Sequence, residues 1–234
     1  MGVFDFVKKG ENLQQAANRV AGGDRAASAA SSGQAAQQMS DKCACFAQEL
    51  NCLVSLPLRK FIMNCLDNAP DYFFEMAASS TGKYHPAYTL GSGGLVRHTK
   101  AACRIAESLL RLEMYQALNN RRDEIIAALI MHDSIKKGRD GSAYTTTDHP
   151  LQAAQYVMDM AAEYRDAGGD LDMGQIEFIA ELIKSHMGQW NTDFDGNAIL
   201  PKPITPAQQF VHLCDYLASR KFITITEEWG APLQ

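Results

Sequence analysis

The stretch Ile125-Ile126-Ala127-Ala128-Leu129-Ile130-Met131-His132-Asp133 decides the fold of this 234-residue chain. Seven consecutive apolar residues lead directly into a histidine and an aspartate, and helical periodicity places Leu129 beside both of them. We therefore predict a helix from about Arg122 that carries His132 and Asp133 into the core. An ionised carboxylate in such a place is costly unless a cation or a metal ion pairs with it.

Other side chains of the metal-binding type recur in similar settings along the chain. They are His98, His149, His186 and Asp215. His98, His186 and Asp215 fall on apolar faces of predicted helices, and His149 precedes Pro150, which favours the start of a helix. Each one alone has a simpler interpretation as a hydrogen-bonded core residue or a helix cap. Together with His132 and Asp133, they predict a metal site, and a metal site suggests hydrolysis.

The composition limits the class of protein and its partners. Hydrophobic residues make up 46% and charged residues 21% of the chain, as in soluble globular proteins. The net charge of −5 gives no general attraction to nucleic acid or anionic lipid, so neither duplex DNA nor a membrane is expected as a partner. No apolar run approaches the roughly 20 residues that span a bilayer. No secretory signal is recognised, so a cytoplasmic location is expected.

The cysteines are expected to be reduced thiols that pack as small core residues. Four of them, Cys43, Cys45, Cys52 and Cys65, lie close together in the sequence, so the alternative is that they form a structural zinc site. Their spacing lacks the paired two-residue gaps of zinc ribbons, so buried thiols are the preferred interpretation.

The chain divides by composition into 1–40 and 41–234. The first segment is rich in Ala, Ser, Gln and Gly and has little to bury, so we predict a flexible or loosely helical, low-complexity tail. The alternative is a docking arm for a protein partner, with Phe4 and Phe6 as anchors. The second segment is expected to form the folded domain.

Residues 41–234 predict an all-α fold, because apolar residues recur at helical spacing and clear alternating strands are absent. The predicted helices cover 41–54, 57–66, 95–114, 122–133, 150–165, 174–187 and 205–222, the last with Thr205 as its N-cap and Pro206 at its first position. Turn-rich residues 79–94 are expected to cover the site, and residues 188–202 are the candidate loop for substrate selection. A short segment, 222–226, is β-prone.

The ordered set His98, His132-Asp133 and Asp215 resembles the pattern of the HD-domain metal-dependent phosphohydrolases, which fold as all-α helical bundles. Lys136 completes a His-Asp-x-x-Lys pattern that recurs in that family, and the resemblance covers roughly 60–222. His149 and His186 match the extra histidines of subfamilies that hold a second metal. The resemblance implies two divalent metal ions, for which mixed His and carboxylate ligands favour Mn, Fe, Zn, Ni or Co over Mg.

Three short motifs resemble more closely the HD module of 3′→5′ exoribonucleases that also carry an OB fold. They are Tyr84-His85-Pro86-Ala87-Tyr88, Gly93-Gly94-Leu95-Val96-Arg97-His98-Thr99 and Ser185-His186-Met187-Gly188-Gln189-Trp190. The Ala/Ser-rich residues before the domain are too few and too little strand-like for an OB fold. We therefore expect a small nucleotide-type phosphate ester as substrate, with 3′→5′ cleavage of short RNA as the alternative.

The resemblance also implies roles for individual residues. His98, His132 and Asp215 would hold one metal, His149 and His186 the other, and Asp133 would bridge them while an activated water attacks phosphorus. Lys136 would hold a phosphate oxygen, or alternatively would be a solvated lysine at a helix end.

Three further residues, His85, Arg97 and Trp190, are predicted to bind substrate, whereas His212 has no place in the pattern. An enzyme of the phosphohydrolase or phosphodiesterase type is the leading hypothesis. A non-catalytic HD-fold regulatory or adaptor protein is the second one, and the complete ligand set disfavours it.

Overall fold

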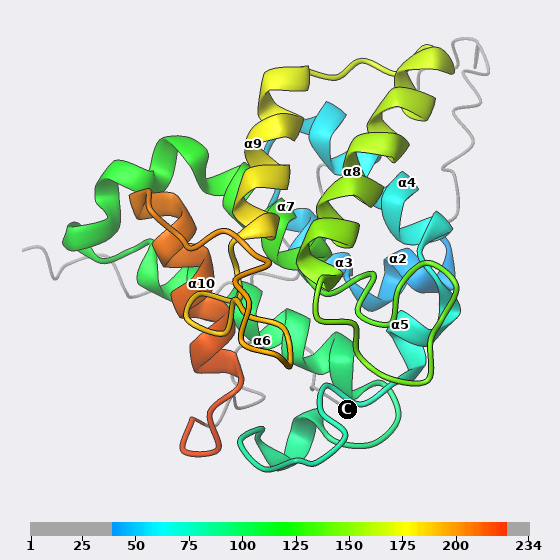
Figure 1. Cartoon of the computed structure of the whole chain (residues 1–234). Coiled ribbons are helices and arrows are strands. Elements are labelled where there is room, and N and C mark those ends of the chain that lie inside the picture. Colours follow the sequence, from blue (N-terminus) through cyan, green and yellow to red (C-terminus); the bar gives the residue numbers. More distant parts are fainter. Residues whose placement is uncertain (1–38, 224–234) are drawn as a thin grey trace, which may run out of the picture. The chain divides into compact units, whose positions relative to one another are not determined.

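A computed structural model describes residues 39–223, which belong to the second of the two units into which the chain divides, Met39–Gln234. Its core is built around α7 (Arg122–Met131), in which every residue from Ile125 to Met131 is buried. A helix that is apolar on all sides needs neighbours on all sides. These are mainly α6 (Gly94–Leu109), α9 (Met173–Lys184) and α10 (Pro206–Ala218), and Figure 1 shows α7 lying among the other helices.

The remaining helices complete the bundle around this centre. They are α2 (Asp41–Cys45), α3 (Ala47–Asn51), α4 (Leu56–Asn68), α5 (Asp71–Glu75), η1 (Ala87–Thr89), η2 (Glu113–Arg121) and α8 (His149–Asp166). In the described part of the chain, the only strand-like pairing is one isolated bridge between Thr192 and Ala198. The all-α prediction is thus confirmed. No helix between residues 39 and 223 combines the length and the apolar character needed to cross a bilayer.

Local sequence explains where several helices begin. Thr205 caps α10 through a capping box with Gln208, and Pro206 occupies the first turn, as predicted. Ser55 caps α4 by accepting a hydrogen bond from the backbone N–H of Leu58. These caps fix the register of each helix and hence the direction in which its side chains point.

Several predicted helices differ from the observed ones, and those predicted for 174–187 and 205–222 end earlier, at Lys184 and Ala218. The helix predicted for 41–54 is broken at Phe46, whose backbone leaves the helical region and whose buried ring stacks on Phe73 at a centroid distance of 5.8 Å. The helix predicted for 95–114 ends at Leu109, and a tight turn follows. The apolar spacing continues through Met114, although that side chain is 74% exposed. Periodicity alone does not show where the chain turns away from the core.

The thiols agree with the preferred prediction only in part. Cys43, Cys65, Cys103 and Cys214 are buried, whereas Cys45 is exposed and Cys52 is partly exposed. Residues 1–38 of the predicted tail and 224–226 of the β-prone segment lie outside the described residues.

Candidate metal centre

Six side chains from five segments converge where several helices begin or end. His98 lies on α6, His132 and Asp133 follow α7, His149 is the first residue of α8, His186 follows α9, and Asp215 lies on α10. Their ligand atoms form three overlapping groups, each with all atoms within 4.8 Å of one another. The groups are His98/His132/Asp133, His132/His186/Asp215 and Asp133/His149/His186.

The buried carboxylate of Asp133 lies at the centre of this cluster. Its Oδ2 is 3.5 Å from Nε2 of His132 and 3.9 Å from Nε2 of His98. Its Oδ1 is 3.2 Å from Nε2 of His149 and 3.7 Å from Nε2 of His186. The two carboxylate oxygens therefore face different pairs of histidines.

Three of the histidines are oriented by the backbone. Nδ1 of His132, His149 and His186 lies 2.7, 2.8 and 2.8 Å from a carbonyl oxygen three residues earlier in the chain. A carbonyl oxygen only accepts, so each Nδ1 must donate its proton. In the neutral rings the lone pair is then on Nε2, the atom that faces Asp133, which is the tautomer required of a ligand that binds metal through Nε2.

Asp215 joins the cluster from α10. Its Oδ1 accepts a hydrogen bond from Nε2 of His98 at 2.9 Å and lies 3.6 Å from Nε2 of His132. Its side chain is 18% exposed, compared with 2% for Asp133, so Asp215 faces the open side of the cluster.

Several buried polar atoms at the centre lack hydrogen-bond partners. These are Oδ1 of Asp133 and Nε2 of both His132 and His149. Buried acceptors without partners are costly, and here they point at one another. A divalent cation would satisfy them together, and a mixed set of imidazole nitrogens and carboxylate oxygens suits the transition metals. The residues present thus fit a metal site.

Electrostatics keep the two carboxylates and His186 in ligand-like protonation states, whereas the carboxylates of Asp133 and Asp215 outweigh burial and raise the pKa of His132. Burial alone would raise the pKa of Asp133, but the charges of Lys136 and His132 outweigh burial and hold that pKa well below its usual range. Burial likewise opposes ionisation of Asp215, yet its contacts with His132 and His98 keep its pKa well below normal. Burial, followed by the charge on His132, lowers the pKa of His186 to about 3. At neutral pH the carboxylates are ionised and His186 is neutral, as metal binding requires.

A cavity of about 340 Å³ opens onto this cluster. It is lined by Tyr84, His85, His98, Asp133, Lys136, His186, Met187, Trp190, Asp215, Tyr216, Ser219 and Arg220. Three larger cavities lie elsewhere among the described residues, and none is lined by any of the six clustered side chains. Size alone therefore does not identify the site, whereas the convergence of ligand atoms does.

The sequence-predicted substrate residues have different positions. His85 and Trp190 line the cavity, and so does Lys136, whose Nζ is 2.5 Å from Oδ2 of Asp133. Because the Lys136 side chain is only 14% exposed, it is not a solvated helix-end lysine. Arg97 does not line the cavity. Its guanidinium donates to the backbone carbonyls of Tyr88 and Leu90, and so braces the loop before α6.

Other cavity residues were missed by sequence reasoning. Tyr84 and Tyr216 are the immediate neighbours of the predicted residues His85 and Asp215, which was a usable signal. Arg220 follows the end of α10, where only the observed helix register brings it to the cavity.

His212 was missed as well, and it supports the loop that carries His186. Its Nδ1 donates to the backbone carbonyl of His186 at 2.7 Å. Gly188 adopts a left-handed conformation beneath the His212 ring, where an added Cβ would lie 2.2 Å from a ring carbon. The glycine therefore allows the loop to approach α10 closely.

Comparisons with known proteins agree with this arrangement. The family model described as HD domain matches residues 95–220, which is more than half of the chain. The matched range contains all six clustered side chains. No curated protein and no solved structure matches the chain.

Proposed function

This chain belongs to the HD-domain family, and from that premise we propose that it is a metal-dependent phosphohydrolase acting on a nucleotide-type phosphate ester. The observation that carries the proposal is the division of the Asp133 carboxylate between two pairs of histidines. A carboxylate whose two oxygens face separate sets of nitrogen ligands is suited to bridge two cations.

The residues divide into two ligand sets. His98, His132 and Asp215 would hold one divalent ion with Oδ2 of Asp133, and His149 and His186 would hold a second with Oδ1. Bound there, such ions supply Lewis acidity, which lowers the pKa of water and neutralises phosphate charge. The backbone carbonyls behind His132, His149 and His186 keep the three rings oriented without rearrangement.

Lys136 and His85 supply polar groups toward the phosphate. Lys136 presents an ammonium at the cavity wall, where it can bind a phosphate oxygen as a point charge. Burial, followed by the charge on His98, lowers the pKa of His85 to about 4. His85 is therefore neutral at pH 7 and offers substrate one donor and one acceptor rather than a positive charge.

The size of the cavity favours a small substrate. Its volume of about 340 Å³ lies at the lower end of the roughly 300–1,000 Å³ that small-molecule sites occupy. One nucleotide suits this space better than an extended strand. A cytoplasmic setting, with a supply of soluble nucleotides, is consistent with this proposal.

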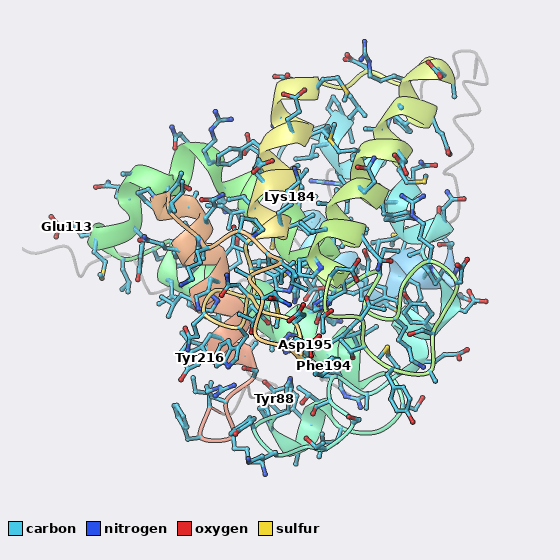
Figure 2. The ribbon with its side chains drawn as sticks, viewed as in Figure 1. Tyr88, Glu113, Lys184, Phe194, Asp195 and Tyr216 are labelled. Atoms are coloured by element: carbon cyan, nitrogen blue, oxygen red, sulfur yellow. The ribbon has the colours of Figure 1, made fainter. Side chains whose placement is uncertain are left out.

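Metal analysis and substrate profiling test the proposal together. We expect purified protein to retain or take up close to two equivalents of Mn, and to hydrolyse members of a panel of mono-, di- and cyclic nucleotides and short RNA. Asp133→Asn should lose both metal and turnover. Asp195→Asn is the matched control, because Asp195 is exposed on the loop between α9 and α10 (Figure 2).

Different outcomes would reject different parts of the proposal. If no Mn-dependent turnover is found, or if Asp133→Asn does not abolish it, the proposed enzymatic function is rejected. Turnover with a single bound ion would reject the dinuclear assignment of His149 and His186. Cleavage confined to RNA would replace the small-nucleotide substrate with an RNA 3′ end.

A further inference from the structure

The outer part of the cavity differs chemically from its floor. Its rim cluster consists of Tyr84, Trp190, Tyr216 and Arg220. Tyr84 lies in the loop before α6 and Trp190 in the loop after α9, whereas Tyr216 belongs to α10 (Figure 2) and Arg220 follows the end of that helix. The floor, in contrast, carries the ionisable ligands around Asp133.

Two aromatic rings of the rim cluster stack on each other, and this stacked pair is called the platform here. Trp190 stacks on Tyr216 with ring centroids 5.8 Å apart and an interplanar angle of 14°. Trp190 is nevertheless 46% exposed, and Tyr84 is 54% exposed. Large aromatic surfaces that remain open at a cavity can be covered by a flat ring of a ligand, which every nucleobase provides.

Arg220 connects the platform to the opposite loop. Its guanidinium carbon lies 4.3 Å from the ring centroid of Tyr216 and 5.5 Å from that of Tyr84. It donates to Oγ of Ser219 at 2.7 Å, and no carboxylate among residues 39–223 forms an ion pair with it. A guanidinium that is held by aromatic faces and lacks an anionic partner is well suited to a planar or anionic ligand.

We propose that the rim cluster binds the nucleobase of the substrate and thereby determines specificity, so that the substrate class is a phosphate ester bearing a flat heteroaromatic ring. This inference rests on the proposed function, because the ester phosphate is assigned to the floor near Lys136. The base then stacks on the Trp190–Tyr216 platform. Arg220 packs against the same ring system and faces the sugar-phosphate.

Substrates with and without a base test this assignment. Mn-loaded protein is assayed with 5′-AMP and with ribose 5-phosphate, which lacks the base. We expect Trp190→Ala and Tyr216→Leu to lower kcat/KM for 5′-AMP roughly tenfold or more, with little change for ribose 5-phosphate. Tyr216→Phe keeps the ring and should recover most of the activity toward 5′-AMP that Tyr216→Leu loses. Phe194→Ala is the control for Trp190, because Phe194 is 94% exposed and does not line the cavity (Figure 2).

A binding measurement separates failure of this inference from failure of the proposed function. The chain has two tryptophans, so Trp229→Phe leaves Trp190 as the only fluorophore of that kind. Added 5′-AMP should quench Trp190 fluorescence in this variant, and ribose 5-phosphate should not. Absence of quenching, or equal losses of kcat/KM for both esters in the Trp190 and Tyr216 variants, would overturn the base-binding assignment. Quenching without hydrolysis would retain the assignment and reject the proposed reaction.

Discussion

The Nδ1 atom of His212 lies 2.7 Å from the backbone carbonyl oxygen of His186, and so joins α10 to the loop that carries one of the six clustered side chains. The carbonyl accepts and His212 donates. His186 is thus positioned from both sides, since its own Nδ1 donates to the carbonyl of Ile183. A hydrogen bond of this kind orients a metal-binding side chain, and it thereby affects metal affinity without contacting the metal.

We predict that His212→Phe weakens metal binding without removing a ligand. Loss of a group that orients a metal ligand typically costs roughly 10- to 100-fold in affinity or activity. His212→Gln retains a donor and should recover part of the loss. Titration with a chelating metal indicator measures the affinity, and circular dichroism checks that both variants keep their helices. Equal affinity in His212→Phe and the unmodified protein would contradict the positioning role.

Metal removal should destabilise the fold. The unpartnered buried atoms of Asp133, His132 and His149 would be satisfied by bound cations, so metal-free protein should melt at lower temperature. At a free metal concentration of 100 times Kd, binding adds about 2.7 kcal/mol to the free energy of unfolding. Thermal unfolding with EDTA and with Mn measures the difference. Asp133→Asn should show almost no response to Mn, and a full response in that variant would be inconsistent with the assigned centre.

Acid should destabilise the chelated protein through His85. Its pKa is lowered to about 4, mainly by burial, whereas an unfolded histidine titrates near pH 6.5. Between these values the unfolded chain binds the proton and the folded chain does not, so this contribution to stability is lost as pH falls. His186, with a pKa near 3, acts with the same sign, and His132, whose pKa is raised, acts with the opposite sign.

Comparing the unmodified protein with His85→Gln isolates the contribution of His85 to the pH dependence, because all other titratable groups are common to both proteins. After allowance for solvent screening, we expect the loss between pH 7 and pH 5 to be about 1 kcal/mol smaller in His85→Gln. Urea unfolding at the two pH values measures it in the presence of EDTA. A loss as steep in His85→Gln as in the unmodified protein would show that His85 is not held neutral.

The thiols should differ strongly in reactivity. Cys45 is exposed, whereas burial raises the pKa of Cys43 to about 12 and that of Cys65 well above its usual value. Only the thiolate is reactive, so iodoacetamide at pH 8 should label Cys45 first. Peptide mass spectrometry of native and urea-unfolded protein gives the order. Rapid native labelling of Cys65 would contradict the buried core around α4.

Much of the fold was predictable because apolar periodicity and caps are local signals. The run from Ile125 to Met131 predicted a buried helix, and Thr205 with Pro206 predicted the start of α10. Helix ends were predicted less well. One predicted helix is interrupted at Phe46, whose ring stacks on Phe73. The spacing of residues within either segment does not encode this contact between segments.

By itself, the sequence determined the helical class and the identity of the metal-ligand candidates, because a histidine or aspartate on an apolar helix face must find a buried partner. The tertiary structure decided which oxygen of Asp133 faces which histidines. It also decided that Lys136 pairs with Asp133, and that Arg97 contacts a loop instead of lining the cavity. It also decided the rim cluster, in which Arg220 meets Tyr84 from a distant segment. The physical reason is that burial is imposed locally by side-chain chemistry and helical repeat, whereas distances between ligand atoms depend on how separate helices pack around α7.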